Sequence, residues 1–366
     1  MTRNTKGKVA IISRESDNKT LDIAMLEAEL RKRGISVIVL SKLLTKDRGI
    51  RSLSYAGHAL RQEAAILSSD VVVLDTYCIP ASMIPHRKGT KVVQIWHALG
   101  AVKKFGWQTV GMPGGSPERT ARLMRMHHGY DYVTCASDIT ADHFCEAFRT
   151  DRSKIVKCGL PRIDYIKSVS SGERRNDMRR KIFSLYPELA GSTRKTVLYA
   201  PTFRRDEAVD VKSLVDALDR DKYNIVVRLH PLYRKDAEDE VLRSIRNDGC
   251  GAVIFDDAFS SFDWLSAADI IISDYSSLVI EAALADKPLY LYTYDLEDYE
   301  ANNGLNMDFS AEPIAPYVFR NAKALAAAMD GEYDLSALRG FRDRYIDIDI
   351  SDCTAAMAGF IEELIK

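Results

Sequence analysis

Runs of β-branched and aliphatic residues alternate with helical patterns from one end of the chain to the other, and no other feature constrains the fold as strongly. Between the first two runs, residues 21–30 carry apolar side chains at helical spacing, and Gly34 ends that helix. Strands that alternate with helices form βαβ units, so the pattern predicts an α/β protein with parallel sheets. The strands predicted in the first half are Lys8–Ile12, Ser36–Leu40, Val71–Leu74, Lys91–Ile95, Tyr132–Ala136 and Lys154–Cys158. Those predicted in the second half are Thr196–Tyr199, Asn224–Val227, Ala252–Phe255, Asp269–Ile272 and Pro288–Tyr292.

A change of composition divides this pattern into two similar halves. From about Asp164 to Arg194 the chain is charged and contains serine, which is typical of a linker with a solvated helix. A length of 366 residues suits two domains. We therefore expect Rossmann-like domains over residues 1–165 and 195–350, a linker with a helix over 166–194, and a C-terminal helix over 351–366 that could cross back. Two α/β halves of this kind predict a cleft between facing sheets.

The overall composition excludes several classes of protein. With 46% hydrophobic and 28% charged residues the chain is typical of a soluble globular protein, and its net charge of -1 argues against a dedicated nucleic-acid binder. The six cysteines are scattered without a CxxC pair or zinc spacing, which favours reduced thiols over a metal site. The first residues do not resemble a signal peptide, and no apolar run is long enough to cross a bilayer. We expect a cytoplasmic protein that could still visit a membrane surface, with no metal and no cofactor.

Polar and reactive residues directly follow four of the predicted strands. Doubly wound sheets bind their ligands at the carboxyl ends of their strands, so these residues form the candidate site. They are Trp96-His97, the segment 200–205 with Thr202, Arg204 and Arg205, the segment 228–231 with Arg228 and His230, and the segment 273–277.

Ser276 and Ser277 open the helix that follows the last of these strands. Their hydroxyls, with the N–H groups of the helix start, could hold phosphate oxygens, and Glu281 one turn further could accept hydrogen bonds from two ribose hydroxyls. A plain N-cap in front of a buried helix explains the same residues. In the same way, Arg204 could be a forked donor to a diphosphate or a solvated surface charge. His97 could be a general base or a structural histidine.

Together these segments resemble the CDP-glycerol glycerophosphotransferase family, the teichoic acid primases and polymerases. The similarity covers roughly residues 90 to 310 in the right order, whereas the first eighty residues carry little of it. The similar blocks are 94–106 with Trp96-His97, 111–115, 137–138, 159–164, 200–204, 228–231, 273–277 and 287–295.

The resemblance implies a GT-B fold, a CDP-glycerol or CDP-ribitol donor, and metal-independent transfer of an alditol phosphate to an acceptor hydroxyl with release of CMP. It implies that His97 is the general base and that His230 is the second catalytic-site histidine, at the donor phosphates. The donor-binding residues that it implies are Thr202, Arg204, Arg228, Ser276, Ser277 and Glu281. Acceptors in this family are lipid-linked, which implies a lipid-linked saccharide or polyol-phosphate acceptor, peripheral association with the inner face of the cytoplasmic membrane, and no nucleic acid.

Three positions depart from the family pattern. Many members carry Gly where this chain has Ala98, and many carry Asp where it has Glu281. Asn303-Gly304 stands where many members have Arg-Gly. These differences leave the alditol of the donor and the acceptor open, but not the transfer chemistry.

A group of basic residues follows the Trp96-His97 block. Arg119, Arg122 and Arg125 fall at helical spacing, and Lys103 and Lys104 could extend the patch. A solvated helix face explains the three arginines; a surface for anionic lipid headgroups or a phosphate-rich acceptor is the functional alternative.

Three weaker motifs are interpreted as structural. Asp347-Ile-Asp349 has the pattern of a metal-binding DxD, but it lies far from the strand ends and is assigned to the surface. Gly111–Gly115 lacks the Lys-Ser/Thr of a P-loop and is predicted to be a turn. Asp256-Asp257 is predicted to be a pair of loop residues.

Two other functions stay open from the sequence. A GT-B glycosyltransferase that uses a UDP-sugar would need the same cleft and phosphate site, and a non-catalytic two-domain binding protein would need the cleft alone. The combination of Trp96-His97 with the 228–231 block favours the alditol-phosphate transferase.

Overall fold

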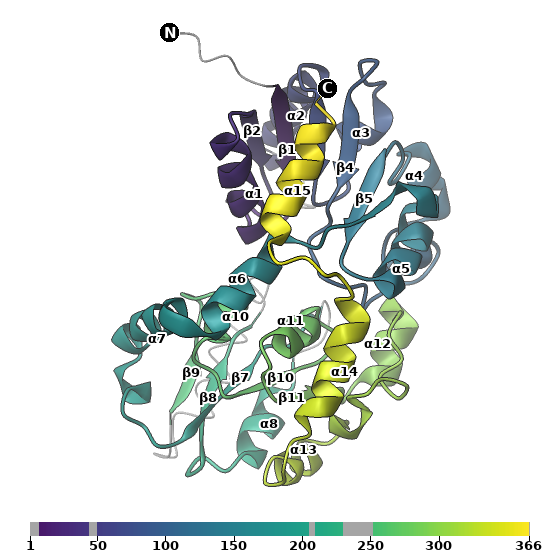
Figure 1. Cartoon of the computed structure of the whole chain (residues 1–366). Coiled ribbons are helices and arrows are strands. Elements are labelled where there is room, and N and C mark those ends of the chain that lie inside the picture. Colours follow the sequence, from purple (N-terminus) through teal and green to yellow (C-terminus); the bar gives the residue numbers. More distant parts are fainter. Residues whose placement is uncertain (1–6, 44–49, 205–208, 230–251, 366) are drawn as a thin grey trace. The chain divides into compact units, whose positions relative to one another are not determined.

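Two compact units make up the part of the chain that the computed structural model describes, which is residues 7–43, 50–204, 209–229 and 252–365 (Figure 1). The first unit comprises Met1–Asp164, Asn302–Gly304 and Tyr345–Lys366, and the second comprises Tyr165–Ala301 and Leu305–Arg344. Within the described residues, each unit contains one sheet of six strands whose neighbours all pair in parallel. The predicted α/β class with two Rossmann-like parallel-sheet domains is therefore confirmed.

The strands of the first unit are β1 (Lys8–Ser13), β2 (Ser36–Ser41), β3 (Val71–Leu74), β4 (Lys91–Gln94), β5 (Tyr132–Cys135) and β6 (Ile155–Lys157). They lie in the order β2-β1-β3-β4-β5-β6. Each was predicted from the sequence with ends that differ by one residue at most, because buried parallel strands are short continuous apolar runs.

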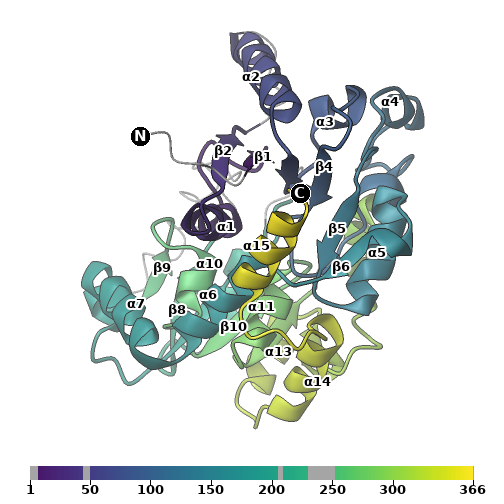
Figure 2. The same ribbon diagram turned by 45° about the horizontal axis from the view of Figure 1, so that its top comes forward.

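Helices cover both faces of this sheet. On one face, side chains of α2 (Ile50–Leu67), α3 (Ile79–Met83) and α5 (Asp138–Phe148) share a core with the strands. Elsewhere in the unit, the C-terminal helix α15 (Cys353–Glu363) lies beside α1 (Leu21–Lys32), as Figures 1 and 2 both show. The guanidinium of Arg33 joins the two helices, because it donates to the carbonyl of Ala355 at 3.0 Å and to Glu362 at 3.2 Å. The remaining helix of this unit is α4 (Glu118–Leu123), and 3₁₀ turns lie at Gly106–Thr109 and Arg152–Lys154.

The strands of the second unit are β7 (Lys195–Tyr199), β8 (Tyr223–Val227), β9 (Val253–Phe255), β10 (Ile270–Ser273), β11 (Leu289–Tyr292) and β12 (Val318–Phe319). They lie in the order β12-β11-β10-β7-β8-β9. The two-residue β12 was not predicted, since its apolar run is too short to stand out.

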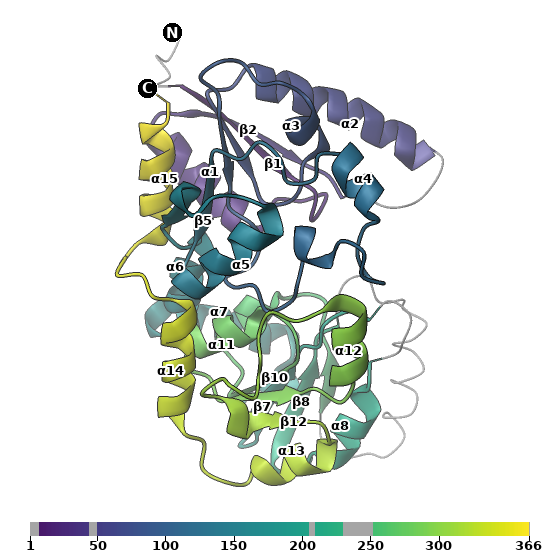
Figure 3. The ribbon, with the colours of Figure 1, turned by 90° about the vertical axis from the view of Figure 1, so that its right-hand side faces the viewer.

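One face of this second sheet is covered by α8 (Val211–Ala217) and α13 (Ala322–Ala328), which lie together in Figure 3. Their apolar side chains pack on alternate residues of the central strands, such as Val197 and Tyr199. The predicted linker segment forms α6 (Pro161–Ser170) and α7 (Gly172–Leu185), and of α7 only Ile182 is buried. The other elements are α10 (Ser261–Trp264), α11 (Leu278–Leu284), α12 (Leu296–Asn303), α14 (Leu335–Tyr345), and 3₁₀ turns at Pro187–Leu189 and Ala315–Tyr317.

Each sheet has a point at which the strand order reverses direction. In the first unit, β2 lies on one side of β1, and β3 to β6 follow in sequence order on the other side, so the reversal lies between β1 and β3. In the second unit, β8 and β9 lie on one side of β7, and β10 to β12 follow on the other side, so the reversal lies between β7 and β10. Loops that leave the carboxyl ends of two such strands diverge to opposite faces of the sheet and open a crevice between them. The strand orders therefore place one candidate crevice in each unit.

Candidate active site

His97 follows β4, and its loop is held by the side chain of Gln94. The Gln94 amide donates to the carbonyl of Thr76 at 3.1 Å, and its oxygen accepts from the N–H of Trp96 at 2.9 Å. Trp96 has a φ of 58°, a left-handed conformation that a bulky residue seldom adopts. The indole stacks on Phe105 at 4.4 Å between ring centroids, so packing holds this turn in place.

The hydrogen bond of His97 fixes which ring nitrogen can act as a base. Nδ1 lies 2.8 Å from the backbone carbonyl of Asp75, and a carbonyl can only accept, so Nδ1 carries the proton of the neutral ring. The lone pair is then on Nε2. The side chain is 32% exposed, so it is in contact with solvent. The carboxylate of Glu15 lies 3.8 Å from Nδ1.

Asp75 is a buried carboxyl group at the same edge that sequence reasoning missed. It directly follows β3, and it is only 2% exposed. Neither of its carboxylate oxygens has a hydrogen-bond partner in the described chain. Burial, which disfavours the charged form, raises the pKa of Asp75 to about 7. The rule that selected His97, a polar residue directly after a predicted strand, applies equally to Asp75 and would have found it.

In the second unit, Arg204 joins three of the sequence blocks. Its guanidinium donates to Asp295 at 2.6 and 3.0 Å and lies 2.9 Å from Asp274. It also donates to the carbonyl of Thr202 at 2.7 Å and lies over the rings of Tyr275 and Tyr299. Burial alone would lower its pKa, but the two carboxylates outweigh burial and raise the pKa above the usual value.

The surroundings of Arg204 bear on its predicted role. The side chain is only 5% exposed, and its donors point at protein acceptors. The geometry thus shows that Arg204 holds the loops after β7, β10 and β11 together, whereas direct contact with donor phosphates stays a prediction.

The serines and Glu281 lie next to this network, at the start of α11. The backbone N–H of Thr202 donates to both oxygens of Asp274, at 2.9 and 3.0 Å, so the loops after β7 and β10 meet at the predicted crevice. Ser276 accepts from the N–H of Leu278 at 3.3 Å. The Ser277 hydroxyl makes no cap bond and lies 3.4 Å from each carboxylate oxygen of the buried Glu281.

Arg228 faces Asp256 rather than open solvent. Its guanidinium donates to the Asp256 carbonyl at 3.3 Å, and its Nη1 lies 3.9 Å from an Asp256 carboxylate oxygen. Asp256 is buried and accepts from Trp264 Nε1 at 2.8 Å and from the Tyr186 hydroxyl at 2.6 Å. Asp256 lies in the loop after β9, as predicted, and its carboxylate also ties Tyr186 and Trp264 to that loop. His230 and Arg205 lie outside the described residues.

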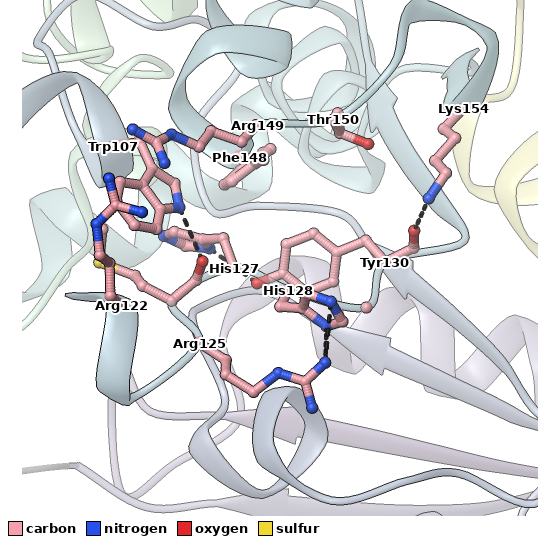
Figure 4. Close-up of a pocket in the computed structure, with 12 residues that line it drawn as sticks. Trp107, Arg122, Arg125, His127, His128, Tyr130, Phe148, Arg149, Thr150 and Lys154 are labelled. Atoms are coloured by element: carbon pink, nitrogen blue, oxygen red, sulfur yellow. Dashed lines mark hydrogen bonds between the residues drawn. The ribbon is translucent and has the colours of Figure 1, made fainter. Parts of the chain in front are cut away.

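The basic residues do not form the single helix face that their spacing predicts. Helix α4 ends at Leu123, and Arg125 lies beyond it with a φ of 44°. Arg119 and Lys104 are exposed, and Lys103 is half-buried. Arg122 and Arg125 line an open pocket of ≈ 540 Å³ (Figure 4).

Residues 302–304 pack against the loop that carries these lysines. The N–H of Lys104 donates to the carbonyl of Gly304 at 3.1 Å. Gly304 has a φ of 74°, and a Cβ there would lie 2.7 Å from the Lys104 side chain. The glycine of the Asn303-Gly304 pair is thus required by both conformation and space.

The weaker motifs have structural partners. Asp347 accepts from the N–H of Asp138 at 2.9 Å and pairs with Lys157 at 2.5 Å, so it anchors the chain leading to α15. Gly111–Gly115 forms turns, as predicted. Over the described ranges, no group of three His, Cys, Asp or Glu residues could hold a metal ion. Likewise, none of the helices seen in those ranges is both apolar enough and long enough to span a bilayer.

Comparison with known proteins adds to this geometry. The model of the CDP-glycerol:poly(glycerophosphate) glycerophosphotransferase family matches residues 4–356. The chain is 30% identical to the teichoic acid ribitol-phosphate primase of Bacillus spizizenii, over 87% of this chain and 82% of that protein. It is 27% identical to the teichoic acid glycerol-phosphate primase of Bacillus subtilis, over 84% of this chain and 77% of that protein. The wall teichoic acid polymerase TagF shares the fold, with a TM-score of 0.71, 18% identity, and coverage of 99% of this chain and 89% of that one.

Proposed function

The chain belongs to the CDP-glycerol:poly(glycerophosphate) glycerophosphotransferase family, and from this premise we propose a specific reaction for it. It transfers glycerol phosphate, or the related ribitol phosphate, from a CDP-alditol to a hydroxyl of a lipid-linked or polymeric acceptor in teichoic acid synthesis. The leaving group is CMP. The observation that carries this proposal is the hydrogen bond from His97 Nδ1 to the Asp75 carbonyl, because it leaves Nε2 free to take a proton.

The chemistry needs one base and a site that holds a diphosphate. His97 Nε2 takes the proton of the acceptor hydroxyl as the hydroxyl oxygen forms a bond to the phosphorus that carries the alditol. The bond from this phosphorus to the CMP oxygen breaks, and CMP leaves with the electron pair. No covalent intermediate is required, so positioning and charge stabilisation supply most of the rate.

We assign the donor to the crevice of the second unit. Thr202, Ser276 and Ser277 supply hydroxyls there, and Glu281 supplies a carboxylate for the ribose. Arg204 acts on this site by fixing the loops through Asp274 and Asp295. Arg228 is the remaining described cation of the predicted donor site, and it is only partly engaged by Asp256.

We assign the acceptor to the first unit, with the protein bound peripherally at the inner face of the cytoplasmic membrane. Support comes from Arg119, Arg122, Arg125, Lys103 and Lys104, which belong to the same unit as His97. A cationic surface attracts the phosphates of a lipid-linked acceptor and of anionic headgroups.

The test is product analysis with the purified full-length chain. The protein is incubated with CDP-glycerol or CDP-ribitol and a lipid-linked disaccharide, and CMP release and product mass are measured. We expect acceptor-dependent CMP release and a product that is larger by whole alditol phosphate units. No release with any CDP-alditol, or turnover of a UDP-sugar in its place, would refute the proposal.

A further inference from the structure

The pocket in Figure 4 has a composition that the proposed reaction does not yet explain. It lies in the first unit, where the connection from α4 to β5 meets the connection from α5 to β6. Its lining contains Arg122, Arg125, Arg149 and Lys154, and no aspartate or glutamate. Figure 4 shows Arg122 and Arg149 beside Trp107, Arg125 beside His128, and Lys154 beside Tyr130. Arg149 and Lys154 are distant in sequence from Arg122 and Arg125, so this grouping could not be predicted from residue spacing.

Three of these cations have no anionic partner. Arg122 pairs with Glu118 at 2.6 Å. Arg125, Arg149 and Lys154 form no ion pair within the described chain: Arg125 contacts His128 at 3.0 Å, and Lys154 donates to the Tyr130 carbonyl at 2.8 Å. Each of these three therefore keeps its positive charge uncompensated beside one cavity, where an anion would be attracted to all of them.

The backbone around the pocket is held in an unusual conformation. Of the five non-glycine residues with positive φ in the described chain, three border the pocket: Arg125 at 44°, His127 at 57° and Arg149 at 49°. Arg149 occupies the left-handed C-cap of α5, a position that favours glycine. Its guanidinium instead stacks on the Trp107 ring at 3.6 Å, which fixes the direction of its donors.

Aromatic side chains line the pocket and connect it, through the ring of Trp96, with the proposed base His97. Tyr130, Phe148 and the buried His127 line the pocket, and the Nδ1 atom of His127 lies 2.8 Å from the Tyr130 hydroxyl. The Trp96 ring contacts Phe148 at 5.4 Å and His127 at 6.0 Å between centroids. The same ring lies 4.1 Å from the ring of His97, so a single side chain separates the pocket from His97.

We propose that this pocket binds a phosphate ester, and that in the reaction it holds a phosphate of the acceptor while the acceptor hydroxyl reaches His97. The role in the reaction depends on the function proposed above, whereas the binding of phosphate does not. Forked guanidinium donors suit phosphate oxygens, and the aromatic lining suits the apolar face of a polyol or sugar. A phosphate group could come from the acceptor or from free CMP, and the test separates these sources.

Binding is measured by titration calorimetry on the full-length chain with three probes: a short, lipid-free oligo(glycerol phosphate), CMP and inorganic phosphate. The variants are Arg125→Gln and Lys154→Gln, each of which removes one unpaired charge. Arg61→Gln is the matched control, because Arg61 is an exposed arginine on α2 that lies outside the pocket and forms no ion pair with any residue that the structure describes. Circular dichroism and the thermal midpoint verify that each variant folds.

We expect the oligo(glycerol phosphate) to bind, with about tenfold weaker affinity in each pocket variant and no change in Arg61→Gln. Binding should also weaken with added salt. Stronger binding of CMP than of the oligomer, with the same dependence on Arg125 and Lys154, would identify the nucleotide as the source of the phosphate. Failure of all three probes to bind, or equal binding by folded pocket variants, would overturn the proposal. Binding only to vesicles of phosphatidylglycerol would also overturn it, since that would be a membrane surface and not a phosphate pocket.

The kinetic assay then tests the role in the reaction. Arg125→Gln should raise KM for the acceptor about tenfold and leave KM for CDP-glycerol unchanged. Phosphate binding without any CMP release in the parent would refute the proposed function, but the proposal that the pocket binds phosphate would stand. CMP release with no effect of the variants on acceptor KM would refute only the role assigned to the pocket.

Discussion

The carboxyl edges of the two sheets are built alike but use their charged groups in opposite ways. In the first unit, His97 is partly exposed, and the buried carboxylate of the nearby Asp75 has no hydrogen-bond partner within the described part of the chain. In the second unit, Arg204 is buried between Asp274 and Asp295 and its charge is satisfied. A general base needs one free lone pair to take a proton, whereas a buried cation is stable only when it is paired. The comparison supports the proposed base at the first edge, and it shows that Arg204 positions the loops at the second edge.

The largest effect that this comparison predicts is on turnover. His97→Asn keeps an amide that can donate to the Asp75 carbonyl but removes the basic nitrogen, so kcat should fall by about 10²–10⁴-fold with the fold intact. His86→Asn is the control, because the His86 Nε2 atom is bonded to the Ala81 carbonyl at 2.7 Å in a similar way, yet His86 follows no strand. CMP release rates measure both. Equal rates of CMP release in the parent and in His97→Asn would show that His97 is not the general base.

The second prediction concerns stability at the other edge. Arg204→Met leaves two buried carboxylates facing each other without a cation, so the free energy of unfolding should fall by about 3–5 kcal/mol. Arg228→Met should cost less than about 1 kcal/mol, because Arg228 makes only a 3.3 Å bond and a 3.9 Å contact. Urea unfolding of the two variants tests the difference. Similar losses in both would contradict a structural role special to Arg204.

The third prediction concerns pH. The pKa of Asp75 is about 7 in the folded state, whereas its ordinary value is 3.8. Between these two pH values Asp75 is protonated in the native state but ionised in the unfolded chain. The free energy of unfolding should therefore fall as pH rises from about 4 to about 7. Asp75→Asn removes this dependence, and the gap between variant and parent should grow by about 2 kcal/mol from pH 5 to pH 8. Parallel stability curves would show that Asp75 is charged in the native state at neutral pH.

The smallest predicted effects, on stability and on KM for the donor, distinguish Ser277 from Ser260, two serines at helix starts in the second unit. Ser277 makes no cap bond, so Ser277→Ala should change stability by less than about 0.5 kcal/mol but raise KM for the CDP-alditol several-fold if its hydroxyl holds the donor. Ser260 forms a capping box with Asp263, so Ser260→Ala should cost about 1 kcal/mol of stability without changing that KM. Thermal unfolding and donor kinetics on both variants give the answer. An unchanged KM in Ser277→Ala would remove Ser277 from the donor site.

Much of the fold could be predicted because its signals are local. Strands such as Val71–Leu74 are continuous apolar runs, and the helix at 21–30 has its own period, so neither depends on distant residues. The sequence blocks after the strands likewise resemble those of the family, because a block is a local run of residues. The helix expected through Arg125 was wrong, because equal spacing does not reveal a left-handed residue that ends the helix.

The amino-acid sequence is enough to predict the α/β class, every described strand except β12, the family, and His97 as the candidate base. Which residues meet is visible only in the folded chain: Arg204 pairs with Asp295, and Arg125 and Lys154 line one pocket. The buried carboxylate of Asp75 has no hydrogen-bond partner among the described residues. The reason is that strand order, and not sequence spacing, brings distant loops to one crevice. Burial then requires the charge of Arg204 to be paired and raises the pKa of Asp75.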